Sequence, residues 1–405
     1  MISLSSKSRN ITAAIKLTAS KSESNRALII AELCDDKISI NNGSDSDDTR
    51  VLLNALCNYK DIDTIDIGPA GTSMRFLTSF LASRPSGKWI LTGSKRMQQR
   101  PIHVLVDALN QLGAQITYTK EIGYPPLMIT ANYLTGNKVK IEGNISSQFI
   151  SSLMLIAPSL PKGLEIEFTT PLISKSYLLM TSAIMEYFGA NCSWTEKGTS
   201  ISPTNYISRS FTVEADWSAA SYWYGYAALS TSCDLELTGL KQESLQGDFA
   251  LVDIYDKLGV ITTFLENGIK LTKKERSTGK LEYNMQNCPD IAQTVLVTCA
   301  ALGVEAHLTG LETLKIKETD RLLAMQTELR KINAQLEINN LDAASLAPNQ
   351  DIQPPTESFA TYHDHRMAMS FAPLSLLFPI EIENQEVVTK SYPNFWKDTA
   401  TIEFD

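Results

Sequence analysis

The feature that most constrains the fold is a unit that recurs along the chain, in which a short polar segment precedes a helix of apolar and small residues. Successive units start 50 to 76 residues apart, which suits a group of strands and helices rather than one turn of a solenoid. Alternating β-rich stretches, such as Thr64 to Ile67 and Leu235 to Leu237, lie between the helices. The six starts are Lys21, Gly71, Ser147, Asp216, Asp290 and His365. Because 405 residues exceed one ordinary core, the pattern predicts an α/β fold of two domains with three units each.

The predicted helix starts favour anion binding. Each carries Ser, Thr, Asp or Asn where a cap is expected. The helices that follow, such as Phe149 to Ala157 and Ser221 to Leu229, are apolar on most sides and should be buried. The N-terminus of a buried helix offers free N–H groups and a partial positive charge. Any one of these residues can be an ordinary cap, but six similar starts, several with Lys, Arg or His, favour a shared anion-binding cleft.

Charge and composition exclude several classes of protein. A net charge of −9 argues against a nucleic-acid surface. The longest apolar run, near Phe371 to Ile380, is about half of a membrane span, and Met1 to Ile15 has no signal-peptide core. The cysteines form no CxxC pair, and His363 with His365 supplies only two metal ligands. We therefore expect a cytoplasmic monomer with no metal, no cofactor, and no nucleic-acid or membrane partner.

One charged segment, Lys315 to Leu322, stands out, although a salt-bridged helix start would have the same composition. Its KETDR sequence resembles that of the enolpyruvyl transferase family, specifically the 5-enolpyruvylshikimate-3-phosphate synthases. Further segments resemble that family's motifs in the same order, from Lys21 to Pro393. They are KSESNR at 21–26, GPAGTSMR at 68–75, RP at 100–101, SSQF at 146–149, SKSY at 174–177, PD at 289–290, DHRMAM at 364–369 and KSYP at 390–393.

The resemblance implies an inside-out α/β barrel in each of two similar domains. Each domain would hold three βαβαββ units, with helix N-termini facing an interdomain cleft. Residues 19–214 would form the shikimate 3-phosphate domain. Residues 1–18 and 215–405 would form a discontinuous domain on the side of the phosphoenolpyruvate carboxylate.

The resemblance also implies a reaction. The carboxyvinyl group of phosphoenolpyruvate would pass to the 5-hydroxyl of shikimate 3-phosphate, with release of phosphate, by addition and elimination through a tetrahedral intermediate. This reaction would be a step of the shikimate pathway, which leads to chorismate and the aromatic amino acids. One alternative is the sister transferase that acts on UDP-N-acetylglucosamine, but its mobile loop carries a Cys that Ser94 to His103 lacks. Another is a phospho-metabolite binder without catalysis, against which Asp290 and Glu318 count.

The residue roles follow from the same resemblance. Proton transfer would fall to Asp290, Glu318 and Lys21. Shikimate 3-phosphate would be bound by Lys21, Ser22, Arg26, Ser146, Ser147, Gln148, Ser174, Tyr177, Asp290 and Lys317. Phosphoenolpyruvate would be bound by Lys21, Gly71, Arg100, Gln148, Arg321, Arg366 and Lys390. A donor role for Glu318 requires that the pull of its cationic neighbours on its pKa be overcome.

Three positions depart from the family's usual residues. Pro69 stands where an Asn is common, Thr313 where an Asn often contacts the phosphate of shikimate 3-phosphate, and Phe76 where a Pro is frequent. None of these changes removes a charged group, so we expect them to alter affinity rather than the reaction.

Overall fold

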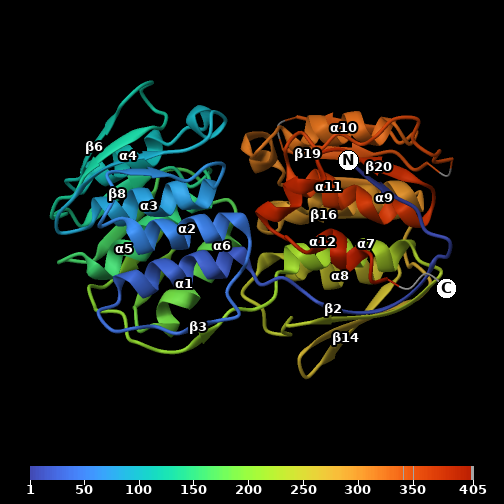
Figure 1. Cartoon of the computed structure of the whole chain (residues 1–405), viewed down its shortest axis with the longest axis horizontal. Coiled ribbons are helices and arrows are strands. Elements are labelled where there is room, and N and C mark those ends of the chain that lie inside the picture. The colour runs from blue at the N-terminus through green and yellow to red at the C-terminus, as the bar shows by residue number, and fades with distance from the viewer. Residues whose placement is uncertain (341, 350, 403–405) are drawn as a thin grey trace. The chain divides into compact units, whose positions relative to one another are not determined.

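The structure is a computed structural model that describes residues 1–340, 342–349 and 351–402. Contacts divide the chain into two compact units. Unit 1 comprises Met1–Ala19 and Glu214–Asp405, and unit 2 comprises Ser20–Val213. In Figure 1 unit 2 runs from blue to green, and most of unit 1 from yellow to red.

Unit 2 alternates helices with short strands. Its helices are α1 (Lys21–Leu33), α2 (Asp47–Asn58), α3 (Gly71–Ala82), α4 (His103–Gln111), α5 (Ser147–Ile156) and α6 (Lys175–Tyr187). Its strands are β3 (Ile40–Asn41), β4 (Thr64–Asp66), β5 (Lys88–Thr92), β6 (Gln115–Tyr118), β7 (Leu127–Thr130), β8 (Lys138–Ile141), β9 (Leu164–Phe168), β10 (Cys192–Thr195), β11 (Gly198–Ile201) and β12 (Phe211–Thr212).

Unit 1 repeats this alternation. Its helices are α7 (Trp217–Leu229), α8 (Leu251–Lys257), α9 (Ala292–Leu302), α10 (Arg321–Arg330), α11 (His365–Phe371) and α12 (Phe395–Thr399). Its strands are β1 (Ile2–Leu4), β2 (Asn10–Lys16), β13 (Ser232–Thr238), β14 (Val260–Leu265), β15 (Gly268–Lys273), β16 (Lys280–Asn284), β17 (Glu305–Thr309), β18 (Leu336–Asn339), β19 (Ala343–Leu346) and β20 (Ile380–Ile382).

The four-stranded sheets share one connectivity. In unit 2 the strand order is β4-β5-β7-β6 in one sheet and β8-β9-β11-β10 in the other. In each, the first two strands are parallel and joined through a helix, while the last two form an antiparallel hairpin. In unit 1 the same pattern gives β16-β17-β19-β18 and β2-β13-β15-β14. Each of these four sheets is therefore one βαβαββ unit.

Unit 2 is inserted within one repeat of unit 1. Strand β2 pairs in parallel with β13 over seven residues, although unit 2 lies between them in the sequence. Where the chain leaves and returns, Ala19 bridges Ala215, and the Asp216 N–H donates to the Thr18 carbonyl at 2.9 Å. These contacts close unit 1 across the insertion.

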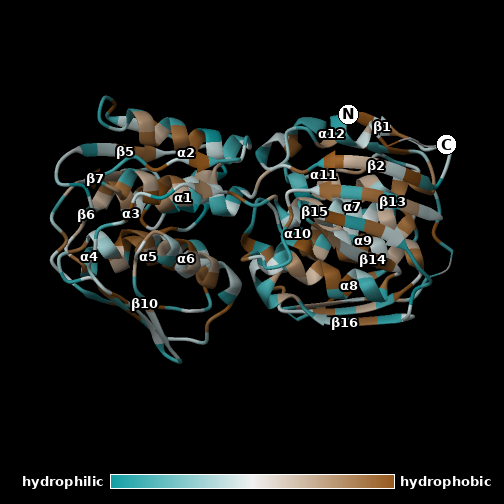
Figure 2. Cartoon of the chain, turned by 90° about the horizontal axis from the view of Figure 1, so that it is seen from below, coloured by the Kyte–Doolittle hydropathy of each residue, from teal (hydrophilic) through white to brown (hydrophobic). Residues whose placement is uncertain are grey.

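The helices form the interior of each unit. All twelve residues of α3 are buried, and α3 packs against α1 and α5. In unit 1, α7 packs against α9 and α11 and exposes almost none of its surface. The strands lie outside and alternate between hydrophobic and hydrophilic residues, as in β13, where the buried positions are every second residue (Figure 2). Each unit encloses its own hydrophobic core.

The expected mixed α/β fold is confirmed, with two differences in detail. Two of the expected six repeats carry only two-stranded sheets, β3 with β12 and β1 with β20. Asp290 does not begin an α-helix but lies in a 3₁₀ turn, Pro289–Ile291, ahead of α9. The capping prediction also holds only in part. Asp216 and Asp364 accept backbone N–H bonds, whereas the side chains of Ser146 and Ser174 cap nothing.

The core of unit 2 should be sensitive to truncation on α3. Phe80 is fully buried and packs edge to face against Tyr59, with 5.1 Å between the ring centroids. Phe80→Ala should therefore destabilise the unit by about 3–5 kcal/mol. Chemical denaturation measures this as a lower midpoint. Leu179→Ala, at a position 45% exposed on α6, is the control and should shift stability by less than about 0.5 kcal/mol. Equal midpoints for the two variants would contradict the inside-out packing.

Candidate active site

The charged motif residues of unit 1 gather around one guanidinium, that of Arg321. Its Nε lies 2.7 Å from Asp364 Oδ2, its Nη1 3.1 Å from Asp290 Oδ1 and its Nη2 3.1 Å from Glu318 Oε2. The Arg321 side chain is 2% exposed. Burial opposes its charge, but the three carboxylates outweigh burial and raise the pKa of Arg321 above its ordinary value. Arg321 is therefore a permanent cation that holds three carboxylates in place.

Three further cations complete this cluster. Arg366 Nη2 lies 3.1 Å from Asp290 Oδ2, and Lys317 Nζ lies 3.5 Å from Asp290 Oδ1. Lys390 is ion-paired with Glu318. All six residues predicted for this half of the site are thus brought together. Four cations surround Asp290, Glu318 and Asp364, which leaves the cluster with an excess of positive charge.

Local structure explains how these side chains converge. Arg321 is the first residue of α10, whose N-cap Asp320 accepts the N–H of Leu323 at 3.2 Å. Arg366 is in the first turn of α11, whose N-cap is Asp364, and Lys390 ends the 3₁₀ turn Gln385–Lys390. The starts of α10 and α11 thus supply the two partners of the ion pair between Arg321 and Asp364.

In unit 2, Arg100 and Gln148 converge on the N-terminus of α3. The Arg100 guanidinium lies directly over Gly71, so that a Cβ at Gly71 would be 2.7 Å from Nη1. The Nε of Arg100 is buried, and it has no hydrogen-bond partner among the residues that the structure describes. Gln148 Nε2 donates to Thr72 Oγ1 at 3.0 Å. Helix N–H groups, a guanidinium and an amide at one place form an arrangement suited to phosphate.

Lys21 and Arg26, both on α1, have different surroundings. Lys21 Nζ lies 3.0 Å from Asp48 Oδ2, and the Lys21 side chain is 16% exposed. Arg26 is buried, and its Nε donates to Thr181 Oγ1 at 2.7 Å. Its Nη1 donates to the carbonyl of Ser22 at 2.8 Å, and its Nη2 to the carbonyl of Tyr177 at 3.3 Å. Burial lowers the pKa of Arg26 to about 10. Arg26 therefore ties α1 to α6, whatever further contact it makes with a ligand.

The serines predicted to hold a phosphate lie at helix starts. Ser146 is the N-cap of α5, Ser147 its first residue, and Ser174 the N-cap of α6. Ser174 adopts a left-handed conformation with φ 52°, which is strained for a residue with a side chain and is common at functional sites. Because neither N-cap hydroxyl bonds to its own helix, both remain suited to bind an external acceptor.

Sequence reasoning missed several carboxylates that support these residues. Asp48 pairs with Lys21, and Asp364 is fully buried beneath Arg321 and accepts the Arg366 N–H at 2.9 Å. Asp248 is buried beside Ser218. Burial, and then the negative charge of Asp290, raises the pKa of Asp248 to about 7. Asp364 was visible within the DHRMAM segment, whereas nothing local in the sequence singles out Asp48 or Asp248.

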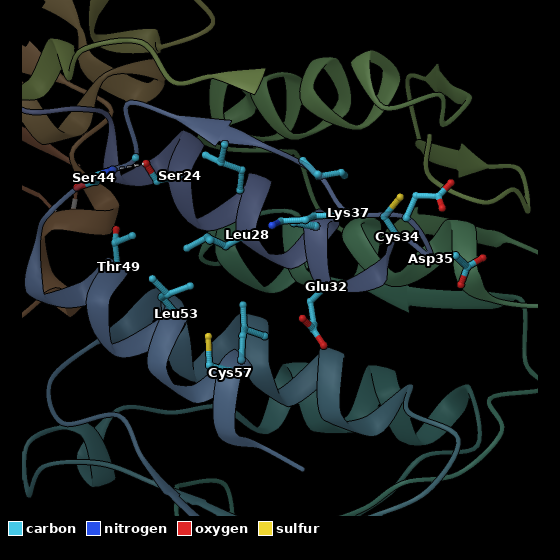
Figure 3. A pocket seen from close by; sticks show the side chains of 16 residues that line it. Ser24, Leu28, Glu32, Cys34, Asp35, Lys37, Ser44, Thr49, Leu53 and Cys57 are labelled. Carbon is cyan, nitrogen blue, oxygen red and sulfur yellow. Dashed lines mark hydrogen bonds between the residues drawn. The ribbon is translucent and has the colours of Figure 1, made fainter. Parts of the chain in front are cut away.

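A separate pocket of about 690 Å³ lies in unit 2 between α1, α2 and the segment after α1 (Figure 3). Leu28 and Leu53 contribute apolar walls, and Glu32, Asp35 and Lys37 contribute charged groups. None of the predicted site residues lines this pocket, so it is not the site that the motifs indicate.

The described residues contain neither a metal-binding cluster nor a helix that could span a membrane. Among residues 1–340, 342–349 and 351–402, no group of three or more His, Cys, Asp or Glu side chains could hold a metal ion. Within that same part of the chain, every helix is too short or too polar to cross a membrane.

Comparison with known proteins identifies the family. The family model described as EPSP synthase (3-phosphoshikimate 1-carboxyvinyltransferase) matches residues 5–64 and 58–399. The chain belongs to the EPSP synthase family. A relative from Bacteroides fragilis, named 3-phosphoshikimate 1-carboxyvinyltransferase, is 46% identical over 96% of this chain and 94% of its own length. One of the same name from Haemophilus influenzae is 36% identical over 96% of each chain. The resemblance seen in the motifs is confirmed, and neither alternative is favoured.

Solved structures show that the chain has the fold of the EPSP synthase family. An EPSP synthase from Acinetobacter baumannii superposes with a TM-score of 0.78 at 21% identity, covering 99% of this chain and 98% of that one. The enolpyruvyl transferase NikO from Streptomyces tendae gives a TM-score of 0.72 at 12% identity, covering 99% and 97%. Since the fold is shared by proteins with different names, the assignment to the EPSP synthase family depends on the sequence matches.

Removing the central guanidinium should destabilise unit 1. Arg321→Met leaves the buried Asp364 without its main partner, and breaking a buried pair in this way costs about 3–5 kcal/mol. Arg330→Met, an exposed position on the same helix, is the matched control and should change stability by less than about 0.5 kcal/mol. Thermal and urea unfolding of both variants measure the difference. Equal stability of the two variants would mean that the buried carboxylate of Asp364 does not need Arg321 as its partner.

Proposed function

We propose that this chain transfers the carboxyvinyl group of phosphoenolpyruvate to the 5-hydroxyl of shikimate 3-phosphate and releases phosphate. The observation that carries this proposal is the match to the EPSP synthase family over nearly the whole chain. The site chemistry supports it, because both substrates are phosphorylated carboxylates and unit 1 presents an excess of cations around two potential proton carriers. A phosphate-release assay that requires both substrates tests it. Turnover with UDP-N-acetylglucosamine as the only acceptor would overturn it.

Each compact unit corresponds, in this proposal, to one functional domain. Unit 2 binds shikimate 3-phosphate through Ser146, Ser147 and Ser174 on its phosphate and Arg26 on its carboxylate. Lys21, Ser22, Gln148 and Tyr177 of the same unit supply further contacts, and Asp290 and Lys317 of unit 1 complete the proposed set.

Phosphoenolpyruvate takes ligands of two kinds. Gly71, Arg100, Gln148 and Lys390 bind its phosphate, since Arg100 lies over the open N-terminus of α3. Arg321 and Arg366 bind its carboxylate. Guanidinium groups suit a planar carboxylate because they donate two parallel hydrogen bonds.

The reaction is an addition followed by an elimination. Asp290 accepts the proton of the C5 hydroxyl of shikimate 3-phosphate as the hydroxyl oxygen attacks C2 of phosphoenolpyruvate. Glu318 donates a proton to C3, so that the double bond between C2 and C3 is lost and a tetrahedral intermediate forms. In the second step C3 returns a proton to Glu318, the double bond between C2 and C3 re-forms, and the bond between C2 and the phosphate oxygen breaks. Phosphate departs with that electron pair and takes up the proton that came from the C5 hydroxyl. Lys21 shares the hydroxyl proton and offsets charge on the leaving phosphate.

Ligand binding also prepares the two carboxylates for these roles. Without substrate, Lys390 and Arg321 contact Glu318, and Arg366 and Lys317 contact Asp290. Incoming phosphate and carboxylate groups compete for the same cations. As those cations turn to the substrates, Glu318 loses the charges that disfavour its protonated form and becomes able to donate.

Two further parts of the proposal concern the protein's state and location. We infer that it acts as a monomer, because each unit builds its own hydrophobic core. A cytoplasmic location fits the six cysteines, which are all free thiols, as expected in a reducing compartment.

Replacing the proton carriers should abolish most turnover without abolishing binding. Asp290→Asn and Glu318→Gln should each lower kcat by roughly 10²–10⁴, the usual contribution of a positioned acid or base. Steady-state assays measure kcat, and calorimetry checks that shikimate 3-phosphate still binds. Glu337→Gln, an exposed carboxylate of β18 in the same unit, is the control and should retain parental activity. Near-parental turnover of either variant would remove that residue from the mechanism.

The approach of Arg100 to Gly71 makes a specific prediction about inhibition. Gly71→Ala places a methyl group 2.7 Å from Arg100 Nη1, so the guanidinium must move away from the phosphate position. We expect the KM for phosphoenolpyruvate and the inhibition constant of glyphosate, a phosphonate competitor, both to rise by about tenfold or more, the equivalent of 1.4 kcal/mol. Gly43→Ala, where a Cβ meets nothing within 4 Å, is the matched control. An inhibition constant equal to that of the parent would exclude this position for the phosphate.

A further inference from the structure

Asp248 is a buried carboxylate for which the resemblance implies no role. It lies in the 3₁₀ turn Gly247–Ala250 and is 5% exposed. Its Oδ2 accepts the hydrogen bond of the Ser218 hydroxyl. Its Oδ1 is buried and has no hydrogen-bond partner among the residues that the structure describes. A buried carboxylate that is only half satisfied is costly, so its presence here points to a role.

The Ser218 hydroxyl joins Asp248 to the proposed site. Arg366 Nη2 donates to Ser218 Oγ at 3.3 Å and also lies 3.1 Å from Asp290 Oδ2. One guanidinium nitrogen is thus shared between Asp290 and a hydroxyl that Asp248 orients. The elements that carry these residues, α7 and two 3₁₀ turns, contact one another, and α7 also contacts α11.

The charged surroundings of Asp248 are mostly negative. Asp290, in the 3₁₀ turn Pro289–Ile291, and Asp216, at the start of α7, both disfavour a negative charge on Asp248, whereas Arg366 on α11 favours it. Cys288 also faces Asp248, but burial and the nearby carboxylates raise the pKa of its thiol, so it stays neutral. Burial is the largest effect on Asp248 and, with Asp290, raises its pKa to about 7.

We propose that Asp248 is a positioning residue that, through Ser218, sets how strongly Arg366 is available to the carboxylate of phosphoenolpyruvate. This inference rests on the proposed function of Arg366. When Asp248 is ionised, Arg366 is held by two negative groups on its own unit, and a substrate carboxylate must compete with both. When Asp248 is protonated, it can still accept from Ser218 but no longer attracts Arg366 by charge.

The direction of the pH effect follows from the raised pKa of Asp248, about 7. Below that pH the carboxyl is neutral, and above it the carboxylate competes for Arg366. Affinity for phosphoenolpyruvate should therefore fall as the pH rises through about 7. Titration of the substrate itself also contributes, but it is the same for parent and variant and cancels in their ratio.

Asp248→Asn separates charge from shape, since its amide oxygen can still accept from Ser218. At about pH 8.5 the variant should have a KM for phosphoenolpyruvate about tenfold lower than the parent, the effect of about one pKa unit of interaction. At about pH 6, where the parent carboxyl is already neutral, the two should agree. The KM for shikimate 3-phosphate should not change at either pH. A merely structural role would change both constants and would not depend on pH.

Two further variants keep the test decisive. Asp253→Asn removes an equal charge from an exposed position on α8 and should behave as the parent at both pH values. Ser218→Ala removes the bridge and with it one acceptor that competes for Arg366, so the KM for phosphoenolpyruvate should fall about threefold or more at about pH 8.5, as expected for one lost hydrogen bond. The proposal is overturned if Asp248→Asn keeps the parental pH dependence, or if Ser218→Ala binds phosphoenolpyruvate as the parent does.

Two measurements distinguish a failure of this inference from a failure of the proposed function. If the parent shows no phosphate release with both substrates, the proposed function fails. Calorimetric titration of phosphoenolpyruvate into parent and Asp248→Asn at the two pH values then still decides the role of Asp248, because it needs no turnover. Equal affinities for the two proteins at the alkaline pH would refute that role.

Discussion

The ion pair between Arg321 and Asp364 is the interaction on which the arrangement of unit 1 depends. Asp364 is fully buried and caps α11, while Arg321 is nearly fully buried at the start of α10. Two charges so far from water are tolerated only because each satisfies the other and several further groups. The guanidinium has donors left for Asp290 and Glu318, so the pair that joins two helix starts also places both proposed proton carriers.

The two units concentrate positive potential by different physical means. Unit 1 gathers side-chain cations that internal carboxylates hold, and in the proposed function the substrates replace these ion pairs. Unit 2 relies on helix starts at Gly71, Ser147 and Lys175, with serine hydroxyls and an Arg100 that lies over a glycine. In a chain of net charge −9, both are local exceptions to an acidic surface.

Much of the architecture could be predicted from the sequence. The spacing of polar helix starts indicated six units, and four of them are complete βαβαββ sheets. The same reasoning was less accurate at Asp290, where Pro289 begins a 3₁₀ turn, and at Ser146 and Ser174, whose side chains do not cap. Periodicity reports which face of an element is buried, but it does not report the dihedral angles of a single turn.

The sequence by itself determined the family, the order of the motifs and the identity of the charged groups, because these depend on residue type and position along the chain. Only the tertiary structure decided which carboxylate faces which cation. Asp48 and Asp248 lie 27 and 118 residues from the respective cations, Lys21 and Arg366, that they influence. Electrostatic interaction depends on distance through space and on burial, and both arise only when the helices pack together.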